Sequence, residues 1–286
     1  MSEPHSDRRQ ESTATWWAES PVVASLDFGF ATMLSEFEGA FRLLHDQYVW
    51  RRYMTPDPSG LRLNLHNILP STKVLVVKAE ARVVGTLTVV EDSRLGLPMD
   101  EAFGAEMGRL RERGRRVAEA ASLAVDPSYR ECGVAILVRL LRMAVLYAAR
   151  IARVDDLCFA LHPRHREFYL RLFPFRRFSE MRTSPRINGA PVIGLRLDLG
   201  LVHALIRIER AGLSPGPHTN FLCGPQTYSQ VMARLRRDLP RSALTPLEWA
   251  RLFADAGQQA ADGADLSTVQ LGALVGAVHG EPGGRP

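Results

Sequence analysis

The sequence Glu119-Ala-Ala-Ser-Leu-Ala-Val-Asp-Pro-Ser-Tyr-Arg-Glu-Cys-Gly-Val-Ala135 decides the fold of this chain. It predicts a strand, Val117 to Val125, that carries one acid and is followed by a turn at Asp126-Pro127-Ser128. The apolar residues after the turn predict a long helix from Gly133 to Ile151. A turn that leads into a helix leaves free backbone N–H groups, and these favour anions such as phosphate.

The turn contains the pattern Arg130-x-x-Gly133-x-Ala135. Such a pattern arises by chance in roughly a third of chains this long, so its position between a strand and a helix carries the argument. A carboxylate on the preceding strand and a phosphate-binding turn together suit an acyl-transfer enzyme. We expect Arg130, Gly133, Val134 and Ala135 to bind the phosphate of a pantetheine arm, with Glu119 near its thioester.

The composition is typical of a soluble globular protein, with 46% hydrophobic and 23% charged residues among 286. This length accommodates one large domain, or a domain of roughly 150–200 residues with an extension. Cys132, Cys158 and Cys223 are odd in number and widely spaced, which predicts reduced thiols and no metal site. The first twenty residues lack a signal-peptide core, and Arg139 and Arg142 interrupt the best apolar run. We therefore expect a cytoplasmic protein without a transmembrane segment.

Positive charge is concentrated around the proposed phosphate turn. Between Arg130 and Arg186, twelve arginines stand against five acids, a local +7 in a chain whose net charge is +5. Such a region would attract an acidic or phosphorylated partner, and we expect no nucleic-acid partner. The alternative is that arginine is simply the usual cation of this chain, because Lys73 and Lys78 are its only lysines.

Hydrophobic periodicity predicts an α+β domain with a central, mostly antiparallel sheet flanked by helices. We predict helices at 34–53, 99–113, 133–151 and 163–173, and strands at 73–79, 83–90, 117–125, 155–160 and 192–199. The chain divides into a flexible N-terminal arm, the main domain, a helical C-terminal extension and a disordered tail, at 1–25, 26–200, 201–279 and 280–286.

This order of elements is similar to the acyltransferase layout of the GNAT superfamily. The resemblance implies that Arg130-x-x-Gly133-x-Ala135 is the pyrophosphate-binding motif. It also implies that the strand from Val117 separates from its neighbour to admit the pantetheine arm.

A narrower resemblance is to the long-chain N-acyl amino acid synthases, which are relatives of the acyl-homoserine lactone synthases. It is carried, in order, by the stretches Arg42–Val49, Gly85–Thr88, Gly96–Asp100, Glu119–Val125 and His162–Tyr169. The lactone synthases have a Ser-Arg pair where this chain has Ser122-Leu123, which argues against lactone synthesis. The residues after Gly200 lie outside the resemblance.

The family resemblance implies transfer of a fatty acyl group from acyl carrier protein to the α-amine of an amino acid. No tightly bound cofactor is expected, and the donor is an acyl-phosphopantetheine carried by acyl carrier protein or coenzyme A. Arg139, Arg142, Arg150 and Arg153 fall within about 80° of one face of the helix that begins at Gly133. This stripe suits an acidic carrier protein, and the alternative is the solvated face of an otherwise buried helix.

Two side chains are candidates for catalysis. A buried carboxylate with a raised pKa, Glu119, could remove the proton of an α-ammonium group, directly or through water. The alternative role for Glu119 is an ion pair with Arg115 or Arg116. By the resemblance, Tyr169 would protonate the departing thiolate, and the alternative is that this ring only packs against the sheet.

Other groups complete the expected site. A backbone N–H among Leu123, Ala124 and Val125 could stabilise the oxyanion. Cys132 is expected to pack, since direct transfer needs no thiol nucleophile, and His162 and His165 are expected at a helix start. The carboxylate of the amino acid requires arginine or backbone N–H groups, for which the candidates are Arg42, Arg51, Arg52 and Arg94.

Three other functions remain open from the sequence. One is an acetyltransferase that uses coenzyme A, and another is an acyl-homoserine lactone synthase. The third is a catalytically silent module that binds acyl carrier protein or a lipid.

Overall fold

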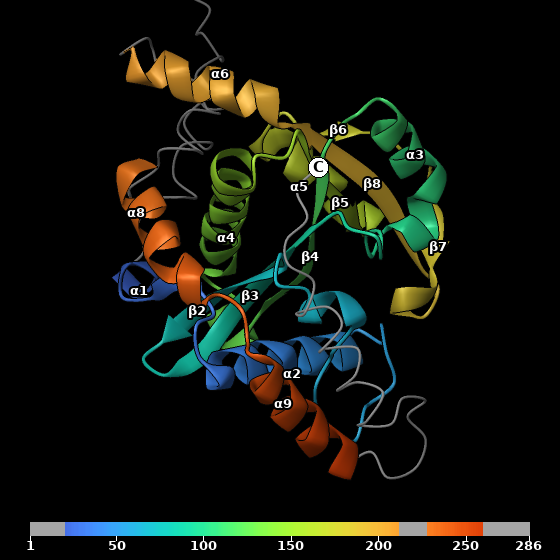
Figure 1. Ribbon diagram of the computed structural model, residues 1–286, viewed down its shortest axis with the longest axis vertical. Helices are drawn as coiled ribbons and strands as arrows, with labels where there is room; N and C mark the ends of the chain where they lie inside the picture. The colour runs from blue at the N-terminus through green and yellow to red at the C-terminus, as the bar shows by residue number, and fades with distance from the viewer. Residues whose placement is uncertain (1–20, 212–227, 260–286) are drawn as a thin grey trace, which may run out of the picture.

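A mixed sheet of eight strands runs through the computed structural model, which describes residues 21–211 and 228–259 (Figure 1). Neighbouring strands are antiparallel except for one parallel pair, β4 with β5, so the predicted α+β plan is confirmed. The strand order is β1 (Asp27–Phe30), β2 (Lys73–Ala79), β3 (Arg82–Glu91), β4 (Val117–Val125), β5 (Asp156–Leu161), β8 (Ala190–Asp198) and β6 (Arg176–Arg177), with β7 (Arg182–Ser184) also paired to β8.

Helices cover both faces of the sheet. On one face pack α4 (Gly133–Tyr147) and α5 (Arg166–Leu172), and on the other packs α2 (Leu34–Trp50). The centre of strand β2 is apolar on both faces for this reason, since Leu75 and Val77 join the α4 core while Val74 and Val76 join the α2 core. The helix α3 (Asp100–Glu112) forms a third, smaller core at the far end of the sheet (Figure 1).

The helix ends follow from local sequence. Helix α3 stops where Gly114 adopts φ +67°, a conformation that glycine takes without the steric cost of a side chain, as predicted for this position. Helix α4 continues into a π-helical turn, Ala148–Ala152, and ends at the left-handed residue Arg153. The predicted helix at 163–173 is a 3₁₀ turn, Pro163–His165, followed directly by α5.

Four short elements were not predicted from the sequence. Helix α1 (Pro21–Ala24) lies inside the predicted N-terminal arm, yet its Val23 is 1% exposed. Strands β1, β6 and β7 have two to four residues, too few to produce a periodic pattern. Pairing with β2 makes β1 the edge of the sheet and brings the residues before α2 into the domain.

The C-terminal extension is helical where the structure describes it: α6 (Leu199–Arg210), α8 (Tyr228–Asp238) and α9 (Pro246–Gln259). Helix α8 lies beside α4, and α9 lies on α2 (Figure 1). The extension therefore packs on both helical layers of the sheet. The predicted disordered tail at 280–286 lies outside the described residues. None of the helices within 21–211 and 228–259 is long and apolar enough to cross a membrane.

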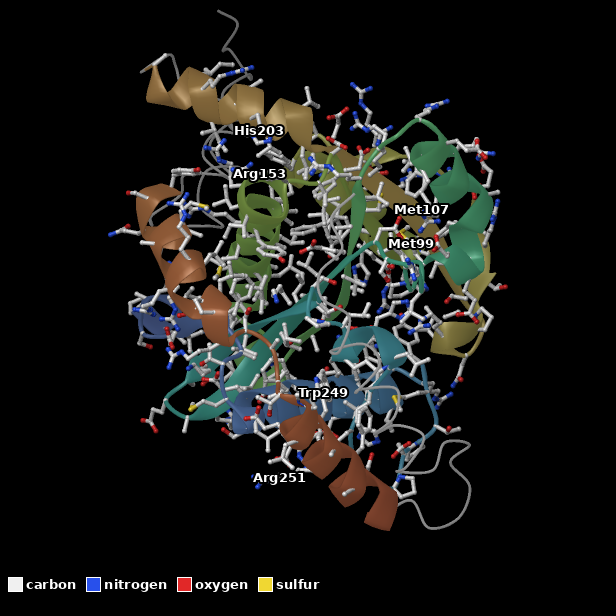
Figure 2. All side chains as sticks on the ribbon, viewed as in Figure 1. Met99, Met107, Arg153, His203, Trp249 and Arg251 are labelled. Atoms are coloured by element: carbon white, nitrogen blue, oxygen red, sulfur yellow. The ribbon has the colours of Figure 1, made fainter. Side chains whose placement is uncertain are left out.

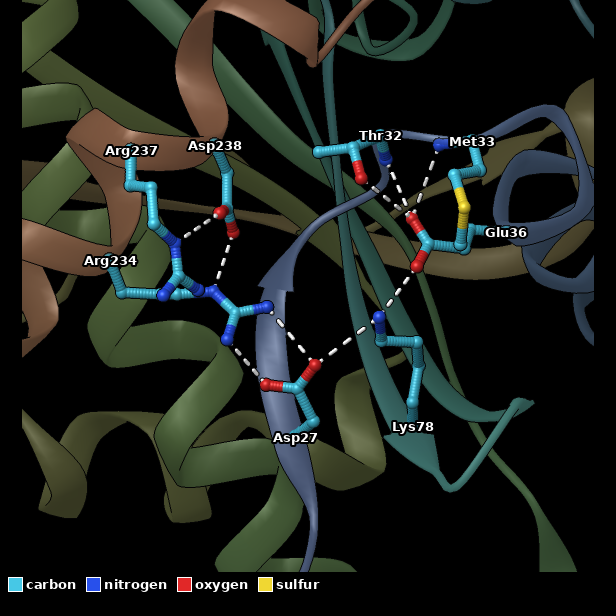
Figure 3. Close-up of polar contacts among 8 residues, drawn as sticks. All are labelled: Asp27, Thr32, Met33, Glu36, Lys78, Arg234, Arg237 and Asp238. Carbon is cyan, nitrogen blue, oxygen red and sulfur yellow. Dashed lines mark hydrogen bonds and ion pairs between the residues drawn. The ribbon is translucent and has the colours of Figure 1, made fainter.

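A chain of ion pairs ties α8 to the start of the domain (Figure 3). Arg234 of α8 binds Asp27 of β1, with Nη1 to Oδ1 at 2.5 Å, and Asp238, with Nε to Oδ2 at 2.6 Å. Lys78 of β2 binds the other oxygen of Asp27 at 3.2 Å and reaches Glu36 of α2 at 2.5 Å. Elements from the beginning and the end of the described chain thus share one network, in which each partly buried charge has an opposite neighbour.

Two further features of this network involve Glu36 and Gly29. Glu36 also accepts the backbone N–H of Thr32 at 2.7 Å, so it caps the start of α2 while holding Lys78 (Figure 3). Gly29 lies beneath the pair from α8, because a Cβ there would approach Asp238 Oδ2 to 2.4 Å and Arg234 Nη2 to 2.6 Å. A side chain at this position would displace the Arg234 and Asp238 side chains from their present positions.

Helix α9 is held by aromatic packing. Trp249 is 2% exposed and stacks on Phe41 of α2 at 6.1 Å between ring centroids, and on Phe253 at 5.6 Å. Figure 2 shows Trp249 on the side of α9 that faces α2, with Arg251 on the outer side. Burial of a ring this large contributes several kcal/mol.

We predict that Trp249→Ala lowers the free energy of unfolding by about 3–5 kcal/mol, because it leaves a cavity between α9 and α2. The matched control is Leu247→Ala in the same helix, since Leu247 is 63% exposed. Urea unfolding of both variants checks the difference. Equal losses in the two variants would show that α9 does not pack on α2.

Candidate active site

The parallel pairing of β4 with β5 ends at Glu119. Only three residue pairs connect the strands, Val117–Asp156, Ala118–Leu157 and Glu119–Cys158. Beyond this point β4 stays paired to β3 as far as Val125, and β5 stays paired to β8 as far as Leu161. The two strands therefore separate, as predicted, and Glu119 lies where the separation starts.

A β-bulge shapes the diverging half of β4. Ser122 has φ +53°, and the register with β3 shifts between Thr86 and Thr88. A left-handed residue other than glycine costs on the order of 1 kcal/mol, and bulges bend the strand that carries them. The separation is thus built into the backbone of β4.

Glu119 is a buried acid. It is 3% exposed, and its Oε2 accepts the backbone N–H of Met99 at 2.7 Å. Burial raises the pKa of Glu119 to about 8, against the lowering effects of the Met99 N–H and of the positive charge of Arg186. Neutral pH therefore lies close to its titration, which suits a general base.

The alternative sequence hypothesis, an ion pair with a neighbouring arginine, is not what the structure has. Arg115 binds Asp156, with Nε to Oδ2 at 2.6 Å, and Arg116 lies beside Asp155 at 3.8 Å. Among the described residues, no ion pair neutralises Glu119. Its side chain points away from α4, because Ala118 and Ala120 on either side of it pack into the α4 core.

The loop before α3 presents the N–H that Glu119 accepts. Gly96 has φ +69°, and a Cβ there would meet Asp100 Oδ2 at 2.4 Å. Asp100 accepts the N–H of Leu97 at 2.8 Å and is bound by Arg111 at 2.7 Å. Gly96 and Asp100 thereby fix the loop, so that Met99 lies directly over Glu119.

The predicted phosphate turn has the expected conformation. The Asp126 side chain accepts the N–H of Ser128 at 2.8 Å and starts a 3₁₀ turn, Pro127–Tyr129, that leads into α4. Arg130 is exposed at this turn, and Arg82 is also exposed beside it, bound to Asp126 at 2.6 Å. The turn is therefore open to solvent and carries two cations.

Two backbone N–H groups are available at the start of α4. The N–H of Gly133 donates to the Arg130 carbonyl at 3.3 Å, whereas those of Val134 and Ala135 have no acceptor in the described part of the chain. The first N–H groups of a helix are free in this way and favour an anion. Val134 and Ala135 are therefore better placed than Gly133 to bind a phosphate oxygen.

Backbone direction separates the three oxyanion candidates. Asp126 donates its N–H to Val84 of β3, at 2.9 Å. Successive N–H groups of a strand alternate in direction, so Ala124 also points its N–H toward β3. The N–H of Val125 points the other way, into the gap between β4 and β5, whereas the left-handed Ser122 interrupts the alternation just before Leu123. Among the three candidates, the alternation therefore favours Val125.

Tyr169 lies buried on α5, next to the end of β5. It is 7% exposed, and its ring contacts Phe159 at 5.9 Å and Phe175 at 6.0 Å between centroids. Burial, with a smaller effect of Tyr48, raises the pKa of Tyr169, so its hydroxyl keeps its proton at neutral pH. This position allows both expected roles, packing and proton donation.

The two histidines and Cys132 contact residues close to them in the chain. His162 accepts the N–H of Arg164 at 3.2 Å and so caps the turn before α5, next to His165. The thiol of Cys132 contacts the Tyr129 carbonyl at 3.5 Å and packs against the α4 core. In the described ranges, no three His, Cys, Asp or Glu side chains are grouped to hold a metal.

The arginine stripe of α4 is covered, which corrects the prediction of a basic docking face. Arg142 is 4% exposed, and Arg139 donates to the carbonyl of Val23 at 3.1 Å. Arg150 donates to the tyrosine hydroxyl of α8 at 2.9 Å. Of the four, Arg153 alone is exposed; Figure 2 shows it near His203 of α6. The arginines do share one side of the helix, as the periodicity predicts, but α8 and α1 pack on this side.

The expected acceptor arginines lie at the surface. Arg42 pairs with Glu38, Arg51 donates to Gln47, and Arg52 and Arg94 are exposed. Sequence reasoning missed two arginines: Arg186, whose charge acts on Glu119, and Arg62, which donates to the Arg186 carbonyl at 3.1 Å. Both lie in irregular segments without a periodic pattern, so only the tertiary structure brings them to the site.

Comparisons with known proteins agree with this fold. A family model described as N-acyl amino acid synthase FeeM matches residues 39–198, just over half of the chain. The structure of FeeM, an N-acyl amino acid synthase from uncultured soil microbes, is 23% identical over 61% of this chain and 91% of that chain, with a TM-score of 0.54. This likeness confirms the predicted acyltransferase fold.

Two other solved structures show weaker similarity. The AHL synthase LasI is 12% identical over 61% of this chain and 89% of its own, with a TM-score of 0.46. An acyl-CoA N-acyltransferase from Pseudomonas aeruginosa is 17% identical over 60% of this chain and 99% of its own, with a TM-score of 0.41. A search of curated protein sequences found no match.

We predict a pH-dependent stability effect for Glu119→Gln. The pKa of Glu119 is about 8 in the folded chain and near 4.5 when unfolded, so the folded state binds the extra proton between these values. Wild-type stability should fall as pH rises from 5 to 9. The variant escapes this loss, on the order of 3–5 kcal/mol.

Urea unfolding of both proteins at pH 5, 7 and 9 measures this difference. Glu112→Gln, an exposed site on α3, is the control and should differ from wild type equally at every pH. A difference for Glu119→Gln that does not change with pH would contradict a raised pKa.

Proposed function

The chain belongs to the family of N-acyl amino acid synthase FeeM, and we propose that it transfers a long-chain acyl group from acyl carrier protein to the α-amine of an amino acid. The observation that carries this proposal is the position of Glu119. A buried acid with a pKa of about 8 lies where two strands separate, opposite a turn suited to phosphate. Family membership makes the chain an acyltransferase, and the donor and acceptor are the proposed part.

The gap between β4 and β5 suits the pantetheine arm. Its phosphate would lie on the N–H groups of Val134 and Ala135, near Arg130, and the arm would extend along the unpaired edge of β4. The unpaired N–H groups of that edge can bond the amides of the arm as an added strand does. The thioester would then lie close to Glu119.

Direct transfer needs three events. Glu119 takes a proton from the α-ammonium group, and the free amine attacks the thioester carbonyl. The resulting oxyanion would be stabilised by the N–H of Leu123 or Val125. The C–S bond then breaks, and the thiolate takes a proton from Tyr169, whose hydroxyl is protonated at neutral pH. The nitrogen loses its second proton in the same step, and this proton would restore the Tyr169 hydroxyl, directly or through water. Amide and free phosphopantetheine thiol are the products.

Acyl carrier protein is the proposed donor because of the family resemblance and the exposed cations beside the turn. Arg82 and Arg130 are both exposed there, and acidic partners are attracted to such groups. Coenzyme A carries the same arm and would use the same turn, so the choice of donor is a matter for experiment.

We predict that Glu119→Gln lowers kcat/KM for the amino acid by about 10²–10⁴-fold, because the amide cannot accept the proton. The control Glu112→Gln should retain wild-type activity. Steady-state assays with acyl carrier protein as donor measure both. Activity of Glu119→Gln within a factor of three of wild type would remove Glu119 as the base.

We predict that Arg130→Glu lowers kcat/KM at least tenfold for donors that carry the phosphate, namely acyl carrier protein and acyl coenzyme A. Acyl-pantetheine, which lacks the phosphate, should change by less than about threefold. The control is Arg109→Glu on α3, since Arg109 is exposed and distant in sequence from the turn. Equal losses with all three donors would contradict phosphate binding at the turn.

The same assays compare the two natural donors for the wild-type enzyme. We expect a higher kcat/KM with acyl carrier protein than with coenzyme A at equal chain length, through added protein contacts. If product forms with acyl coenzyme A but not with acyl carrier protein, acyl coenzyme A is the donor.

A further inference from the structure

Arg62 is a half-buried cation without an acidic partner. Its guanidinium lies over the ring of Tyr48 at 4.1 Å, and Nη2 donates to the carbonyl of Arg186 at 3.1 Å. No carboxylate within residues 21–211 and 228–259 pairs with it. Burial lowers the pKa of Arg62, but arginine stays charged at neutral pH. The Arg62 guanidinium is thus available to bind an anion.

Arg186 supplies a second cation to the same place. It lies on the 3₁₀ turn Pro185–Ile187 between β7 and β8, which ends at the left-handed residue Asn188. The Asn188 side chain donates to the Arg52 carbonyl at 3.3 Å and so joins this turn to the segment after α2. The carboxylate of Glu101 is 3.9 Å away and 45% exposed, a weak pair.

The charge of Arg186 acts on Glu119 and on Arg62. It lowers the pKa of both, and that of His66 as well, so Arg186 lies within electrostatic reach of each of the other three groups. They come from three separate parts of the chain: β4, the segment between α2 and β2, and the turn between β7 and β8. The site therefore exists only in the folded protein.

His66 adds an unused hydrogen-bonding group. Both of its ring nitrogens are buried, and neither makes a hydrogen bond of normal geometry, although the backbone of Leu95 and Gly96 is near. Burial lowers the pKa of His66, so the ring is neutral and keeps one N–H to donate. Buried polar groups without a close partner are rare, and His66 is therefore a group that a bound molecule or water could satisfy.

We propose that Arg62 and Arg186 bind the α-carboxylate of the acceptor amino acid, an inference that rests on the proposed function. The two cations compensate an anion, and a guanidinium matches a carboxylate in a bidentate pair. The ammonium group of the same molecule would point to Glu119. Both groups of an α-amino acid are attached to one carbon, so their two sites must lie close together. The structure fits this requirement, since Arg186 lies 3.9 Å from Glu101, two residues after Met99, whose N–H binds Glu119.

This arrangement selects a substrate class. Free α-amino acids satisfy both charges, whereas simple amines leave the arginines unpaired and amino acid esters lose the anion. The enzyme should therefore reject amines that lack a carboxylate, because unpaired buried groups oppose their binding.

The test compares one acceptor with and without its carboxylate. Two acceptors are compared. The first is whichever of the twenty amino acids the wild-type enzyme acylates fastest, and the second is the amine formed by decarboxylation of that amino acid. We expect Arg62→Met to raise KM for the amino acid by about 10–100-fold, with kcat changed much less. The kcat/KM for the amine should change by less than about threefold. Arg186→Met should behave in the same way.

Three controls keep the outcome clear. Arg62→Lys retains the charge without the planar fork and should recover part of the lost affinity. Arg109→Met removes an exposed arginine of α3 that lies 3.7 Å from Glu106, and it should match wild type. Melting temperatures show whether each variant folds, and an unfolded Arg62→Met leaves Arg62→Lys and Arg186→Met to decide.

Each result has one meaning. Variants that still prefer the amino acid over the amine as strongly as wild type would overturn this inference, while the proposed function would stand. A wild-type enzyme that acylates none of the twenty amino acids would overturn the proposed function and this inference with it.

Discussion

The site depends on a parallel strand pairing that stops after three residues. If β4 and β5 continued to pair beyond Glu119, the sheet would be closed and no arm could reach the acid. The bulge at Ser122 turns β4 away, and β3 and β8 keep each strand paired on its outer side. The backbone groups left unpaired by this separation are those that the proposed mechanism uses, for the arm and for the oxyanion.

Burial of Glu119 is the second constraint, and the neighbouring segments are organised around it. The loop held by Gly96 and Asp100 donates one N–H to the acid, and Arg186 stands nearby as a cation. These favourable contacts do not outweigh desolvation, so the pKa stays near 8. Near neutral pH, part of the population therefore carries Glu119 as the carboxylate, and this is the form that can accept a proton from the ammonium group.

The regular elements and the acid could be predicted from sequence, because both are local. Strand β4, the turn at Asp126 and helix α4 follow from periodicity and turn residues, and Glu119 stands out in an apolar strand. The covering of Arg142 and the meeting of Arg62 with Arg186 could not, because they depend on segments far apart in the chain. Periodicity assigns residues to a face of a helix but does not say what packs on that face.

The central claim is the identity of the product. Purified protein would be incubated with long-chain acyl carrier protein, or the matching acyl coenzyme A, and a mixture of the twenty amino acids, and the products identified by mass spectrometry. We expect an amide with the mass of the acyl chain joined to one amino acid, fragmenting to the intact amino acid. A lactone product, or no acylated product from either donor, would contradict it.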